Sequence, residues 1–196
     1  MMNKINLLFV TLFGIGYLKF APGTLASLIT TIILYLIFLY TSQHVQFFLF
    51  VIIVCMFFYS LTAIKSIESQ FKKKDPREIV IDEVVGQSIP IYFFEFNLSL
   101  IHDFPKYKYI ENGPNFYIYE WSNDASALPW EFYLAFFLLF RFFDIVKVFP
   151  CNIIDKKMKN SLGVMLDDII AGIYVIIFIA ILLNLTKYSD IFVIHL

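Results

Sequence analysis

Apolar residues fill five long stretches of this 196-residue chain, and shorter polar segments separate them. Three of the stretches, residues 25–40, 46–64 and 169–185, contain no charged side chain. A helix that crosses a bilayer needs about 20 mostly apolar residues, so the pattern predicts three membrane spans, of which the first is short. The other two stretches, residues 79–96 and 130–149, are apolar but contain charges. Each is predicted to be a helix that either spans the membrane or packs at its face.

The apolar pattern shows no internal repeat, and we expect one all-α domain, a multi-helix membrane bundle over residues 1–196. Its longest polar segment, residues 97–129, is predicted to be an exposed insertion with a turn at the Asn-Gly-Pro that begins at Asn112. Residues 5–13 resemble the centre of a signal peptide but lack an A-x-A cleavage site. We therefore expect this N-terminal segment to be retained.

Basic residues in the short loops predict the orientation of the bundle. Residues 65–77 contain five Lys or Arg, residues 156–159 contain three Lys, and the turn at residues 41–45 contains none. Loops rich in Lys and Arg stay on the cytoplasmic side of a membrane. The basic loops are thus predicted to be cytoplasmic.

Composition supports a membrane protein and excludes other classes. The chain is 60% hydrophobic and only 16% charged, whereas a soluble domain averages about 45–50% apolar and about 25% charged residues. The net charge of −1 and the lack of a basic stripe argue against nucleic-acid binding. Neither Cys55 nor Cys151 belongs to a paired-cysteine motif, so no disulfide framework or zinc site is indicated. No protein partner can be inferred.

Charged residues of three segments, together with the Pro22-Gly23-Thr24 turn of a fourth, fall at one membrane face once the chain is threaded in this orientation. Mg²⁺ prefers oxygen ligands, commonly one or two carboxylates together with waters and a substrate phosphate. A bound metal polarises a phosphoryl oxygen, and basic side chains hold the remaining phosphate charge. We therefore expect a charged cluster that binds Mg²⁺ and a phosphate at the cytoplasmic ends of the helices. Its members are Asp82, Glu83, Arg141, Asp144, Lys147, Asp167 and Asp168.

Two alternatives remain open from the residues alone. An ion-coupled transporter or channel would use intramembrane charges such as Arg141, Asp144 and Lys147 to line a pathway. It would also be expected to distribute charges through the bilayer and to contain repeated halves. A membrane scaffold would use the same charges only as structural ion pairs, and Asp167 and Asp168 only to favour a helix dipole.

Four short blocks of the sequence resemble the phosphatidylglycerophosphatase A family. They occur in the family's order and read GIG and APGT at residues 14–16 and 21–24, IDEVVG at 81–86, FRFFDIVK at 140–147, and LGVMLDDIIAG at 162–172. The resemblance implies Mg²⁺-dependent hydrolysis of phosphatidylglycerophosphate to phosphatidylglycerol and phosphate at a bacterial inner membrane, with a phospholipid as the substrate. The chain departs from the family at Val148, where Pro is usual, and at Asn160-Ser161, where Gly-Gly is usual.

The resemblance also implies which residues form the site. It places Asp82, Glu83, Asp144, Asp167 and Asp168 in the site, and Arg141 and Lys147 on the phosphate. We assign Asp82, Asp167 and Asp168 as metal ligands or water-orienting bases, and Glu83 and Asp144 as further ligands or partners of the basic groups. Gly23 and Thr24 are expected to contact the phosphate at the start of a helix, where backbone amides point outward.

Overall fold

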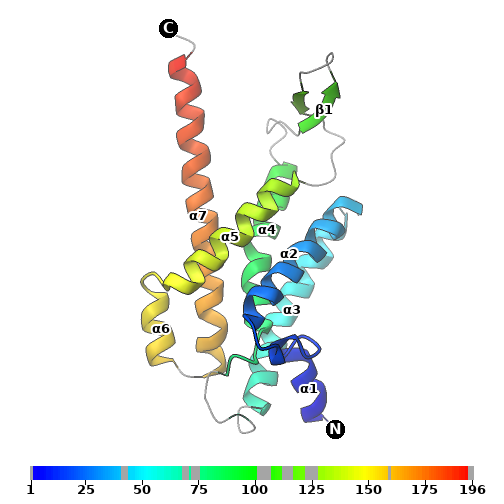
Figure 1. The fold of residues 1–196 in the computed structure, drawn as a ribbon, viewed down its shortest axis with the longest axis vertical. Coiled ribbons are helices and arrows are strands. Elements are labelled where there is room, and N and C mark those ends of the chain that lie inside the picture. The colour runs from blue at the N-terminus through cyan, green and yellow to red at the C-terminus, as the bar shows by residue number, and fades with distance from the viewer. Residues whose placement is uncertain are drawn as a thin grey trace.

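The computed structural model describes residues 2–40, 44–67, 71, 76–100, 107–111, 117–121, 128–158 and 160–193. The described residues form seven α-helices, one short 3-10 helix and a two-stranded hairpin (Figure 1). The helices are α1 Met2–Val10, α2 Pro22–Tyr40, α3 His44–Ile67, α4 Ile81–Leu100, α5 Trp130–Val146, α6 Cys151–Lys157 and α7 Ser161–Val193. The 3-10 helix η1 is Ile15–Tyr17, and the hairpin pairs β1 Tyr107–Glu111 with β2 Tyr117–Trp121 in antiparallel register.

Three of these helices are long and apolar enough to cross a membrane: Pro22–Tyr40, Phe47–Ile67 and Ser161–Leu185. They correspond to the three uncharged stretches of the sequence, so the prediction of three spans is confirmed. Helix α4 lies in the middle of the bundle and contacts α2, α3, α5 and α7. In Figure 1, α7 extends past the other helices toward the C-terminus.

The ends of two spans differ from the prediction, and local chemistry explains both. Helix α2 begins at Pro22, because proline needs no hydrogen-bond acceptor in the first turn of a helix. Helix α7 begins at Ser161, since Asn160 Oδ1 accepts a hydrogen bond from Gly163 N at 2.9 Å and caps the helix. Asp167 and Asp168 therefore lie inside α7. The sequence had suggested that they stand at its start. The cap also gives Asn160 a role where the family usually has glycine.

The predicted insertion at residues 97–129 is smaller than expected at its start, because α4 continues to Leu100. Its described part forms the β1–β2 hairpin, which the sequence did not predict. The turn predicted at Asn112 lies outside the described residues. A buried carboxylate fixes the end of the insertion: Glu95 Oε1 accepts hydrogen bonds from Leu128 N at 2.9 Å and from the Tyr133 hydroxyl.

Two hydrophobic clusters hold the bundle together, and α4 and α7 contribute to both. One contains Ile81, Val85 and Met165 with residues of α1 and α3. The other contains Ile91, Phe136 and Val175 with further residues of α2 and α5. On α7, Asp167 and Asp168 lie between Met165 of the first cluster and Ala171 of the second, and on α4 Asp82 and Glu83 lie between Ile81 and Val85 of the first, so apolar packing on both sides fixes their positions.

Glycines let α4 and α7 approach closely. A Cβ atom at Gly86 would lie 2.7 Å from Asp168 O, and one at Gly172 would lie 2.6 Å from Gly86 O. Both contacts are with backbone atoms, which cannot turn aside as a side chain does. The two helices are therefore packed backbone to backbone beside Asp168.

Replacing Gly86 with valine is expected to destabilise the fold by about 2 kcal/mol, because overpacking of a tight core forces helices apart. Thermal unfolding of the detergent-solubilised protein would measure the loss as a lower Tm. Ile177→Val, at an exposed position of α7, is the control and should leave the Tm nearly unchanged. An equal Tm for both variants would contradict close α4–α7 packing.

Candidate active site

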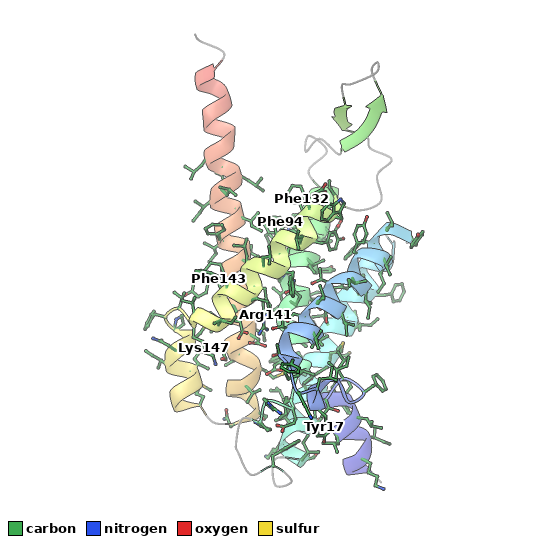
Figure 2. All side chains as sticks on the ribbon, in the orientation of Figure 1. Tyr17, Phe94, Phe132, Arg141, Phe143 and Lys147 are labelled. Carbon is green, nitrogen blue, oxygen red and sulfur yellow. The ribbon has the colours of Figure 1, made fainter. Side chains whose placement is uncertain are left out.

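Four helices bring charged and small residues together in one region of the bundle, which we call the site end. Helices α2 and α4 begin at the site end, α5 ends there, and α7 passes through it. Figure 2 shows Arg141 on α5 in the middle of the bundle and Lys147 where α5 ends. Residues that are more than 100 positions apart in the sequence meet here, as Ser27 and Arg141 do.

Three carboxylates form the centre of the site. Asp82, Glu83 and Asp168 each offer one oxygen, and these oxygens lie within 4.8 Å of one another. Asp168 is only 4% exposed, so water does little to screen the repulsion among the charges. Burial and the nearby Asp168 charge raise the pKa of Glu83, which lies on α4 outside the three apolar spans, to about 8.

This trio fits a divalent metal ion. Hard cations such as Mg²⁺ bind carboxylate oxygens, and several close carboxylates are stable together when a cation offsets their charge. Two buried oxygens of the trio, Glu83 Oε2 and Asp168 Oδ2, have no hydrogen-bond partner among the described residues. Buried polar atoms normally have a partner, so these two oxygens are suited to bind an ion.

Arg141 lies beside the trio with its guanidinium held by three groups. Its Nη1 atom lies 3.0 Å from Asp144 Oδ2 and 3.9 Å from Glu83 Oε1. The same nitrogen donates a hydrogen bond to Ser27 Oγ at 3.3 Å. Its side chain is only 15% exposed, and Nε has no hydrogen-bond partner among the described residues. Part of the guanidinium thus remains available for a bound anion.

Lys147 and Asp167 form a separate ion pair next to the trio. Lys147 Nζ donates to Asp167 Oδ2 at 2.6 Å, and the lysine side chain is 32% exposed. Asp167 therefore contacts a cationic group of the protein, while its neighbour Asp168 joins the trio. The metal-ligand role of Asp167 and the phosphate-binding role of Lys147 stay predictions.

Gly23 and Thr24 lie in the first turn of α2, and Gly23 lies directly against the Glu83 carboxylate of the trio. A Cβ atom at Gly23 would lie 1.7 Å from Glu83 Oε1, so the absence of a side chain gives the Glu83 carboxylate its space. Thr24, the next residue in the chain, is half-buried. The phosphate contacts expected of these two residues stay predictions.

Replacing Gly23 with alanine is expected to reduce activity by about 10- to 100-fold, because the new methyl group displaces the Glu83 carboxylate, and small misplacements of catalytic groups are costly. Stability should change little, since the tip of a glutamate side chain can move. Phosphate release and thermal unfolding of the same preparation would separate the two effects. Leu28→Ala, at a more exposed position of α2, should retain activity. A Gly23→Ala variant with a lower Tm whose folded fraction keeps the specific activity of the parent would contradict this role.

Two polar residues near the site were not singled out from the sequence. Ser27 accepts the hydrogen bond from Arg141, and Gln87 is fully buried one helical turn from Glu83. Neither side-chain polar atom of Gln87 has a hydrogen-bond partner among the described residues. Spacing gave a usable signal for Gln87, since residues four apart share a face of a helix. Ser27 gave none, because serine in an apolar span commonly bonds to its own helix, as Ser27 also does with Gly23 O.

Comparisons with known proteins identify relatives over most of the chain. The family model described as phosphatidylglycerophosphatase A matches residues 8–183. A protein of Haemophilus influenzae named phosphatidylglycerophosphatase A is 33% identical over 177 residues, which cover 90% of this chain and 87% of the relative. A Bacteroides thetaiotaomicron protein named putative phosphatidylinositol-3-phosphatase is 34% identical over 174 residues, covering 86% of this chain and 87% of the relative. No solved structure matches the chain.

Proposed function

The chain belongs to the phosphatidylglycerophosphatase A family, and from this premise we propose that it hydrolyses phosphatidylglycerophosphate to phosphatidylglycerol and inorganic phosphate. It is a lipid phosphatase with apolar helices that can cross a membrane. The observation that carries the proposed site is the carboxylate trio of Asp82, Glu83 and Asp168 beside Arg141. The alternative of an ion-coupled transporter or channel gains no support from the comparisons.

The proposed chemistry transfers a phosphoryl group to water. The bond between phosphorus and the glycerol oxygen breaks, phosphorus gains an oxygen from water, and the glycerol oxygen gains a proton. Asp82, Glu83 and Asp168 would hold Mg²⁺, which when bound supplies positive charge to the phosphoryl oxygens. Arg141 is placed to bind the same phosphate, because its planar guanidinium matches phosphate oxygens. Asp144 and Ser27 position Arg141 through its Nη1 atom.

We propose that the site faces the cytoplasm of a bacterium at its inner membrane. The basic loop at residues 65–77 lies between the end of α3 and the start of α4, so this loop is on the same side as Asp82 and Glu83. The excess of Lys and Arg in that loop favours the cytoplasmic side. The orientation is tested with the variant Arg77→Cys. Its thiol can be probed with a membrane-impermeant thiol reagent in intact cells and in inverted vesicles.

The substrate is tested by phosphate release from two lipids. The detergent-solubilised protein would receive phosphatidylglycerophosphate or phosphatidylinositol 3-phosphate, each with Mg²⁺ or with a chelator. The second lipid is included because of the name of the Bacteroides relative. We expect release from phosphatidylglycerophosphate to depend on Mg²⁺ and to exceed release from phosphatidylinositol 3-phosphate. Preference for the inositol lipid would overturn the proposed substrate, and full activity in the chelator would overturn the metal site.

A further inference from the structure

The loop between α1 and α2 exposes large apolar side chains beside the site. We call Phe13, Tyr17, Leu18 and Phe20 the aromatic rim. Phe20 and Phe13 are 86% and 83% exposed, more than any other large apolar side chain whose exposure is described. Figure 2 shows Tyr17 of this rim near the start of α1 and α2. An exposed apolar patch of this kind indicates a surface that contacts a protein, a membrane or a ligand.

The backbone holds the rim in a fixed and unfavourable shape. Leu12, Phe13 and Ala21 have φ angles of 47°, 54° and 38°, in the left-handed region that non-glycine residues rarely adopt. Hydrogen bonds fix this shape, including Phe13 N to Leu8 O at 2.7 Å and Gly16 N to Thr11 O at 2.9 Å. Strained conformations persist where the surroundings determine them, and they cluster at functional surfaces. The exposed position of Phe13 is therefore built into the loop.

The rim is also tied to the catalytic helices. Val80 N donates to Val10 O at 2.9 Å, which joins the end of α1 to the residue before α4. A Cβ atom at Gly16 would lie 1.9 Å from Glu78 O, so the loop lies directly on the segment that leads to Asp82. At its other end the loop continues through Ala21 into α2 and Gly23. The rim thus keeps a set position relative to the trio.

The chemistry of the rim fits a lipid surface. The rim ends two residues before Pro22, where a membrane span begins, so it lies at the membrane interface on the side of the site. Aromatic side chains are enriched at that depth, and lysines there extend toward the head groups. Lys19 within the rim segment and Lys4 on α1 are both exposed. Their charge suits an anionic phospholipid.

We propose that the aromatic rim is the lipid-entry surface of the protein. The rim inserts into the head-group layer and receives the glycerol and upper acyl chains of a diacyl phospholipid while its phosphate reaches the trio. This inference rests on the proposed function for the identity of the reaction, but membrane insertion of the rim is a separate physical property.

The kinetic test uses a double variant, Phe13→Ser with Phe20→Ser, in the full chain. Its substrates are long-chain phosphatidylglycerophosphate in vesicles of phosphatidylcholine and phosphatidylglycerol, and a water-soluble short-chain analogue. We expect the KM for the vesicle substrate to rise about tenfold with kcat retained, since the rim binds substrate and transition state alike. Kinetics with the short-chain analogue should not change. The control pairs Tyr40→Ser with Phe47→Ser, two residues exposed at the far end of the bundle, and should stay within twofold of the parent.

Equal effects on both substrates, or equal effects in the control, would overturn the proposal. A second measurement does not need activity. Phe13→Trp, in a background with Trp121→Phe and Trp130→Phe, would be reconstituted with brominated phosphatidylcholine. Quenching by the bromolipid supports insertion. Quenching only by aqueous iodide shows a solvated rim, and quenching by neither shows a rim covered by a second copy; either result overturns the proposal. If the lipid phosphatase assay fails but the bromolipid quenches, the proposed substrate is wrong and the rim still inserts.

Discussion

Asp168→Asn is expected to lower phosphate release by about a thousandfold, within the range seen when a group that stabilises the transition-state charge is removed. Asp168 is the member of the trio on α7, and it is buried within reach of Asp82 and Glu83. Asparagine keeps the shape of the side chain but removes one of the three negative charges that would hold Mg²⁺. Initial rates at saturating lipid and several Mg²⁺ concentrations would measure the loss.

The stability of the same variant distinguishes a site residue from a structural one. Removing one charge from three crowded carboxylates relieves repulsion, so the Tm without Mg²⁺ should be equal to that of the parent or higher. The rise in Tm that Mg²⁺ produces in the parent should become smaller, because a ligand stabilises the state to which it binds. Glu131→Gln, an exposed carboxylate in the first turn of α5, is the matched control. Normal turnover of Asp168→Asn would end the assignment of the trio as the metal site.

Arg141→Ala is expected to reduce kcat/KM by at least about a hundredfold, since a charged partner of the phosphate contributes several kcal/mol to the transition state. Arg141 also neutralises Asp144 at 3.0 Å and Glu83 at 3.9 Å. Without Arg141 the net charge of the site becomes more negative, and this charge repels an anionic substrate. Arg141→Lys should recover only part of the activity, because lysine retains the charge but not the planar fork.

A structural role for Arg141 would give a different result. If the arginine only stabilised the helix contacts, Arg141→Ala would lower the Tm while the folded fraction kept its kcat and KM. The control is Arg77→Ala, an exposed arginine in the basic loop that precedes α4. It carries the same charge on the same side of the bundle, and its removal should change kcat/KM by less than about threefold because exposed charges are screened.

The spans and the meeting of charges at one end followed from the sequence because hydropathy and charge placement decide both. The sequence did not show which acidic residues pair with basic side chains and which form the trio. Asp167 and Asp168 are adjacent, but successive residues on a helix point about 100° apart. One of them pairs with Lys147 and the other faces the trio. Which neighbour faces which way depends on the rotation of α7, and the glycine contacts with α4 set that rotation.

The shape of the aromatic rim was also beyond the sequence. Leu12, Phe13 and Ala21 adopt positive φ angles that their residue types disfavour, so no local preference could have predicted them. Hydrogen bonds of the loop backbone and the contact of Gly16 with Glu78 hold the loop in this strained shape. The β1–β2 hairpin escaped prediction for another reason: its two strands are short, and the segment as a whole is polar.

The buried bond between Glu95 and Tyr133 has a mechanical consequence for turnover. It fastens α4 to α5 far from the site, while Glu83 and Arg141 connect the same two helices within it. Glu83 and Glu95 are separated by about 18 Å along α4, at 1.5 Å per residue. Helices α4 and α5 are thus connected at two points that lie far apart along α4. The two connections therefore oppose a hinge-like separation of α4 and α5, while side chains such as Arg141 and Lys147 can rotate without moving the helices.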